Sequence, residues 1–288
     1  MADTIIANSA QILLGTVFGG VALVMLIESM SPLRVEPKAP LMRWISNLAL
    51  SVVGYIILFS IAPLVYILIA QTMGLGNTGL LHHFGIGYIP SFIITLLCLE
   101  FVGYWLHRAS HAVPVLWRFH AVHHSDVEMD ATTSLRHHPL EHVINTLVFV
   151  PAMIALGSDP LVLLSYNVLH AAVSALNHGN FSLGQSADRI LRLFIVTPDF
   201  HRVHHSSEQR YTDSNYASIL PMFDYLFRTA TKFTAEQHTT MPLGLTYFRE
   251  RKYSRLDQLL LMPFQPKFAN QPSKLVEPAI LHDSKNCA

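Results

Sequence analysis

The chain has 288 residues, enough for one large domain or two small ones. Its 19 basic and 19 acidic side chains balance, which argues against a basic surface for nucleic acid. Charged residues make up only 13% of the chain, against about 25% in ordinary soluble domains, and the mean hydropathy is +0.36. The composition therefore predicts a membrane protein.

Three apolar runs in the first 110 residues predict membrane-spanning helices. A bilayer core needs about 20 mostly apolar residues in a helix. Residues 10–30 and 47–71 meet that requirement, and Pro63 predicts a kink in the second run. The third run, 89–106, is shorter and contains Glu100.

Two further apolar stretches, 143–157 and 160–176, are joined by the sequence GSDP. They predict a helical hairpin over 143–176, whose length fits either a thin transmembrane hairpin or a re-entrant one. Residues 1–265 are thus expected to form one all-α domain, a polytopic membrane helix bundle. Residues 266–288 are polar and contain three prolines, so we expect a disordered tail.

The positions of lysine and arginine orient these helices. None occurs in 1–33, 44–107 or 137–188, whereas Arg34, Lys38 and Arg43 fill the loop after the first run. The positive-inside rule then places the N-terminus outside and the 34–43 loop in the cytoplasm. The third run and the hairpin both return to that cytoplasmic face, where the histidine-rich segments follow.

Thirteen of the 17 histidines lie between His107 and His205, in groups with metal-ligand spacing. Two near copies, FHAVHHSD at 119–126 and FHRVHHSS at 200–207, each place a histidine three and four residues before a histidine pair. On a helix this spacing puts the side chains on one face. The candidate ligands are His107, His111, His120, His123, His124, His201, His204 and His205, with His178 as a lone further candidate.

The number of imidazoles limits the kind of metal site. A structural or hydrolytic zinc takes three or four protein ligands, so eight or nine imidazoles suit two metals of higher coordination number. Imidazole favours iron, zinc or copper over magnesium or calcium. Since neutral ligands leave the ionic charge uncompensated, carboxylates are expected close by. Asp126, Glu141 and Asp199 are candidates for orienting the imidazoles, or equally for capping helices, and His138 is a possible ligand or outer-sphere group.

The histidine pattern resembles the fatty acid hydroxylase superfamily, also called the sterol desaturase family, in its bacterial-type form. The family pattern H-x3-H, H-x2-H-H and H-x2-H-H is met by the eight grouped histidines, and His178 stands where the family commonly has a further one. The resemblance covers most of 40–265. It implies an integral membrane enzyme with two non-haem iron ions that uses dioxygen to hydroxylate or desaturate a lipid, fatty-acyl or sterol-like substrate.

Such an oxidation needs electrons from elsewhere. The chain has no dinucleotide-binding glycine run, no haem-attachment motif and no ferredoxin cysteine set. We therefore expect a separate reductase or redox carrier as partner. A zinc-dependent membrane hydrolase and a metal transporter are the alternative functions, and the substrate and the choice between hydroxylation and desaturation stay open.

Overall fold

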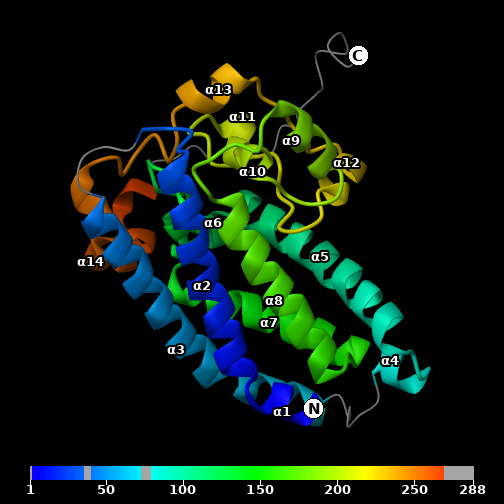
Figure 1. The fold of residues 1–288 in the computed structure, drawn as a ribbon. Coiled ribbons are helices and arrows are strands. Elements are labelled where there is room, and N and C mark those ends of the chain that lie inside the picture. Colours follow the sequence, from blue (N-terminus) through cyan, green and yellow to red (C-terminus); the bar gives the residue numbers. More distant parts are fainter. Residues whose placement is uncertain (1, 36–39, 73–78, 269–288) are drawn as a thin grey trace.

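The computed structural model describes residues 2–35, 40–72 and 79–268, and in these it is helical (Figure 1). The only β structure among them is an isolated bridge between Ser206 and Leu243. The α-helices are α1 (Ala2–Ala7), α2 (Ser9–Met30), α3 (Leu41–Thr72), α4 (Leu80–His83), α5 (Tyr88–Ala112), α6 (Pro114–His124), α7 (Pro139–Leu156), α8 (Pro160–Asn177), α9 (Gln185–Leu191), α10 (Pro198–His204), α11 (Gln209–Thr212), α12 (Met222–Leu226), α13 (Ala235–Thr240) and α14 (Leu256–Leu261). Short 3-10 helices are η1 (Ala131–Leu135), η2 (Arg251–Ser254), η3 (Met262–Phe264) and η4 (Pro266–Phe268).

Five of the described helices are long and apolar enough to cross a membrane: α2, α3, α5, α7 and α8. They contain the five predicted apolar runs except for Gly157, which caps the C-terminal end of α7. The third extends further than expected, because α5 continues past residue 106 to Ala112 and so carries His107 and His111 on its last turns. Helices α7 and α8 have 18 residues each, or about 27 Å at 1.5 Å per residue, close to the thickness of the hydrocarbon core.

The turn between α7 and α8 follows from the GSDP sequence. Gly157 ends α7 in the left-handed conformation, with φ of 65°, and a Cβ there would collide with the backbone of Gly79. Asp159 then caps α8 by accepting a hydrogen bond from the backbone N–H of Leu161 (2.8 Å), and Pro160 occupies the first helical position. These signals make two separate helices.

The polarity of α3 is the reverse of that of a helix in a soluble protein. Its buried side chains include Asn47 and Ser51, whereas Ile56 and Leu64 on the outer face are 61% and 66% exposed. A continuous apolar outer face matches a hydrocarbon solvent, because lipid imposes no cost on exposed leucine and isoleucine. This arrangement supports the membrane assignment.

The long helices pack as two pairs, α2 with α8 and α3 with α7, and α5 contacts both α7 and α8. Helix α1 lies at one end of this bundle, and α6, α10 and the short helices α9 to α13 gather at the other (Figure 1). The three histidine-bearing segments are therefore brought to one end of the bundle.

The C-terminal described segment packs against the same bundle. Leu259 and Met262 are fully buried, in one apolar cluster with Leu50 of α3 and Trp117 of α6. The first three residues of the expected tail form η4, because Phe268 packs into this cluster. Residues 269–288 lie outside the described part of the chain.

Candidate metal centre

The three histidine motifs lie on helix ends that are defined by local signals. Helix α6 begins with Pro114 at its first position and carries its histidines on its last turns. Helix α10 begins at Pro198, and the Thr197 hydroxyl accepts a hydrogen bond from the backbone N–H of Phe200 (3.2 Å). These signals define where α6 and α10 begin.

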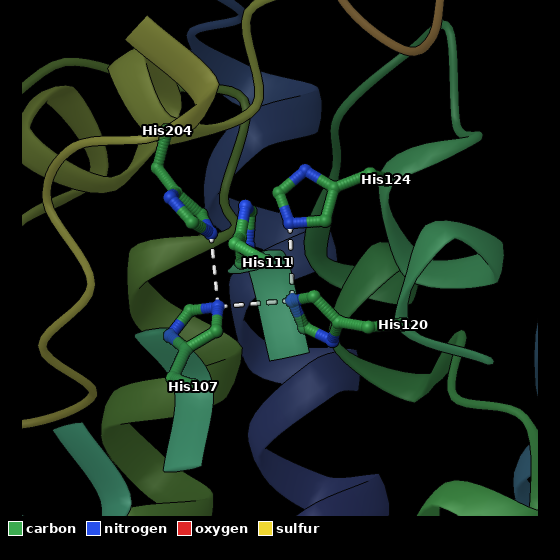
Figure 2. A group of neighbouring side chains, drawn as sticks. All are labelled: His107, His111, His120, His124 and His204. Carbon is green, nitrogen blue, oxygen red and sulfur yellow. Dashed lines mark hydrogen bonds between the residues drawn. The ribbon is translucent and has the colours of Figure 1, made fainter. Parts of the chain in front are cut away.

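Five histidines form one cluster, which we call the five-histidine cluster (Figure 2). One ring nitrogen from each lies within 4.8 Å of those of all the others. The Nε2 atom of His107 lies 2.9 Å from that of His120 and 3.0 Å from that of His204, and the Nε2 atoms of His120 and His124 are 3.2 Å apart. The members are His107, His111, His120, His124 and His204.

Four histidines form a second cluster, the four-histidine cluster, by the same criterion. His178, which follows α8, is its centre: its Nε2 lies 3.2 Å from Nε2 of His123 and 3.1 Å from Nε2 of His201. His205 completes it, with Nε2 3.2 Å from that of His201. The two clusters are adjacent, because the rings of His124 and His205 stack with centroids 4.7 Å apart.

Each H-x2-H-H motif is divided between the two clusters. His120 and His124 belong to the five-histidine cluster and His123 to the other. In the second motif only His204 belongs to the five-histidine cluster, whereas His201 and His205 belong to the four-histidine cluster. Residues four apart on a helix differ by about 40° in direction, whereas adjacent residues differ by about 100°. Each motif can therefore send an i, i+4 pair to one cluster and the remaining histidine to the other.

The outer ring nitrogens of several clustered histidines meet oxygen acceptors. Nδ1 of His107 donates to the backbone carbonyl of Tyr216 (2.6 Å), and Nδ1 of His204 donates to that of Ser214 (2.7 Å). Nδ1 of His178 likewise donates to the carbonyl of Ser174 (2.7 Å). A carbonyl only accepts, so in these three rings the proton sits on Nδ1 and Nε2 presents a lone pair.

With the Nε2 lone pairs facing one another, the geometry of the cluster fits a bound cation. The Nε2 atoms of His107 and His204 both present lone pairs, yet they lie only 3.0 Å apart, and two acceptors at that distance repel unless a positive ion binds both. An ion with nitrogen ligands at about 2.1 Å and right angles between them places neighbouring nitrogens about 3.0 Å apart. The observed separations of 2.9 to 3.2 Å match that spacing.

Burial also keeps the imidazoles in the form that binds metal. Burial lowers the pKa values of five clustered histidines well below the ordinary range, and repulsion from neighbouring imidazoles lowers them further. These residues are His123, His124, His201, His204 and His205. Burial lowers the pKa of His178 to about 3. These rings are neutral at pH 7, as metal ligation requires.

Of the carboxylates expected near the site, Glu141 contacts a clustered histidine. It accepts a hydrogen bond from Nδ1 of His120 (2.8 Å). Its other oxygen lies 3.3 Å from Nδ1 of His137, whose ring stacks on His123 with centroids 4.4 Å apart. Glu141 therefore contacts the five-histidine cluster directly and reaches the four-histidine cluster only through His137, which belongs to neither cluster.

Three other expected residues lie elsewhere. Asp126 accepts hydrogen bonds from Arg43 (3.0 Å) and Thr133 (2.9 Å), and its carboxylate is used in that buried network. Asp199 accepts from Arg202 (2.5 Å). His138 caps α7 by accepting from the backbone N–H of Leu140 (3.1 Å). Among the described residues these groups stabilise the surrounding structure and do not contact a clustered imidazole.

One side chain that sequence reasoning missed is Asp213, whose Oδ1 lies 3.2 Å from Nδ1 of His111. It stands in the segment TDSNY, eight residues after the last histidine motif, and an acidic residue so close to the motif was the available signal. The carbonyls of Ser174, Ser214 and Tyr216 had no such signal, because every residue has a carbonyl and only the fold selects these three.

Comparisons with known proteins agree with this geometry. Residues 92–229 match the family model described as fatty acid hydroxylase, and this region contains all nine clustered histidines. The chain is similar to alkylglycerol monooxygenase of Homo sapiens, 32% identical over 52% of the chain. It is also similar to very-long-chain aldehyde decarbonylase GL1-4 of Oryza sativa subsp. indica, 30% identical over 51%.

A third similar protein is very-long-chain aldehyde decarbonylase CER1 of Arabidopsis thaliana, 29% identical over 47% of the chain. The three alignments cover 32%, 24% and 22% of the relatives' own lengths, so the chain spans about a third or less of each. No solved structure matches the chain.

Proposed function

Because the chain belongs to the fatty acid hydroxylase superfamily, we propose that it is a membrane-bound oxidoreductase that oxidises a lipid with two iron ions and dioxygen. The observation that carries the proposal is the convergence of nine imidazoles into two adjacent clusters. Imidazole suits iron, and nine such ligands exceed what a single metal needs. Iron held there would supply the oxygen chemistry that breaks an unactivated C–H bond.

The protein's own residues would hold and shield the centre. Five histidines would hold one ion and four the other. The carbonyls of Tyr216, Ser214 and Ser174 fix three of the rings with Nε2 facing inward. Eight of the nine histidines are at most 5% exposed, so the fold excludes bulk water from the site. That exclusion protects a reactive centre from side reactions.

We propose a substrate with a long hydrocarbon chain that enters from the bilayer. The clusters lie at one end of five helices that are long and apolar enough to span a membrane, so a lipid chain need not cross water to reach them. The printed names of the relatives, an alkylglycerol monooxygenase and very-long-chain aldehyde decarbonylases, support a lipid-like substrate. Hydroxylation and desaturation both begin by removing hydrogen from a C–H bond.

The reducing electrons would come from a separate reductase or redox carrier that docks at the end of the bundle where α9 to α13 lie.

The proposal is tested with protein purified in detergent without oxygen and loaded with ferrous iron. We expect about two iron ions per chain and oxygen consumption that depends on a supplied reductase. Lipids from cells with and without the protein should differ by an added hydroxyl group or double bond. Zinc-dependent hydrolysis without oxygen consumption would identify a hydrolase instead, and metal uptake into vesicles would identify a transporter.

We propose that the metal centre faces the cytoplasm and that the N-terminus lies outside. The absence of lysine and arginine from 44–107, which contains the turn between α4 and α5, supports this orientation.

A reporter fused to the C-terminus is expected to report the cytoplasm. One inserted after Gly85, in the exposed turn between α4 and α5, is expected to report the opposite side. Protease protection of tags at the same positions provides an independent measurement. A cytoplasmic signal from the Gly85 insertion would show that the charge distribution was misinterpreted.

A further inference from the structure

The two clusters differ in how their imidazoles are held from outside. In the five-histidine cluster, Nδ1 of four rings contacts an oxygen acceptor, and the rings are His107, His111, His120 and His204. In the four-histidine cluster only Nδ1 of His178 does so. Among the described residues, no acceptor reaches Nδ1 of the other three rings, His123, His201 and His205.

One short segment supplies three of the four outer contacts of the five-histidine cluster. Residues 213–216 contribute the Asp213 carboxylate to His111, the Ser214 carbonyl to His204 and the Tyr216 carbonyl to His107. The Tyr216 ring also packs edge-on against these three imidazoles, with centroids 5.2 to 5.7 Å away.

Buried hydrogen bonds hold this segment in place. Asn215 adopts a left-handed conformation, with φ of 52°, and its amide donates to the carbonyls of Phe200 (2.7 Å) and Thr231 (3.0 Å). Asp224, fully buried, accepts hydrogen bonds from the backbone N–H groups of Tyr216 and Ala217, both at 2.8 Å. The outer contacts thus come from a rigid segment.

The negatively charged side chains that contact the imidazoles are also divided unequally between the two clusters. Asp213 and Glu141 each place a carboxylate on a ring of the five-histidine cluster. In the four-histidine cluster the acceptor on Nδ1 is the neutral Ser174 carbonyl. A divalent ion among neutral imidazoles gains from carboxylates that bond to its ligands, and loss of one such outer partner typically weakens metal binding about 10–100-fold.

We propose that the two metal positions are inequivalent, that the five-histidine cluster binds its ion first and more tightly, and that residues 213–216 cause the difference. This inference rests on the metal centre of the proposed function. It adds an order of loading and assigns Asp213 as a positioning residue that acts through His111.

The test is a titration of chelator-treated protein in detergent with Co²⁺, followed by visible absorbance, without substrate or oxygen. We expect two phases, with the first dissociation constant at least about 10-fold below the second. The spectrum of the first phase should be lost in His204→Ala and that of the second phase in His123→Ala, because these residues belong to different clusters.

The Asp213→Asn variant removes the charge and keeps the shape. It is expected to raise the first dissociation constant about 10-fold and leave the second unchanged. The matched control is Glu208→Gln, which alters an exposed carboxylate on the same loop that pairs with Arg210, and it should change neither phase.

Three results would overturn the inference: a single phase in the parent protein, an equal shift of both phases in Asp213→Asn, or a shift of the second phase alone. The melting temperature of the metal-free protein separates a general structural effect from a local one. Failure of the proposed function has a different outcome, because a protein that binds no Co²⁺ would have no metal centre. A protein with two equal sites would keep the centre and lose only the inequivalence.

Discussion

Replacing His204 with alanine is expected to remove the ion of the five-histidine cluster and to reduce lipid oxidation at least about 100-fold. His204 is fully buried, and its Nε2 lies 3.0 Å from that of His107. No water or neighbouring side chain can supply an equivalent metal ligand at that position. Since loss of an outer partner alone costs about 10–100-fold in metal affinity or activity, loss of a ligand should cost more. The measurement is metal per chain and product yield, normalised to membrane-inserted protein.

The matched control is His82→Ala. His82 is exposed on α4, far from the clusters along the bundle, so metal content and product yield should stay at the parent level. Insertion of both variants should be unaffected, because the five long helices are specified by their own apolar sequences. If the His204→Ala variant retained full lipid oxidation, the second H-x2-H-H motif would not supply ligands and the di-iron assignment would be abandoned.

Replacing Arg202 with alanine is expected to lower the free energy of unfolding by about 3–5 kcal/mol. Arg202 is fully buried and donates to Asp199 (2.5 Å) and to the backbone carbonyls of Gly179 and Phe181, both at 2.9 Å. The substitution leaves the Asp199 charge and both carbonyls without their partner, and breaking a buried pair from one side costs more than the pair contributes. Denaturant unfolding in detergent gives the free-energy difference.

Arg210→Ala is the matched control for this loss of stability. Arg210 pairs with Glu208 at the surface, where its side chain is 71% exposed, so its removal should change the free energy of unfolding by no more than about 0.5 kcal/mol. Equal effects of the two substitutions would mean that Arg202 does not join α10 to the segment after α8.

The membrane helices could be predicted because their signal is local. An apolar run of sufficient length must form a helix in lipid, since every backbone N–H and C=O then bonds within the same segment. The runs at 10–30 and 47–71 needed no tertiary information, and the GSDP turn marked the boundary between α7 and α8 by itself. The end of α5 was less predictable, because the helix continues past its apolar run into the sequence HRASHA.

The grouping of the histidines could also be predicted from local sequence, because helical spacing puts residues three and four apart on one face. The sequence by itself therefore determined the membrane bundle and the eight grouped imidazoles at one end of it, with His178 as a lone further candidate. Only the tertiary structure decided which imidazole joins which cluster, since His123 and His124 point about 100° apart and the orientation of α6 relative to α5, α8 and α10 selects their partners. It also decided the outer contacts of Asp213 and of the Ser214 and Tyr216 carbonyls. Buried hydrogen bonds of Asn215 to Phe200, and of Asp224 to the backbone of Tyr216 and Ala217, hold this segment against the rings.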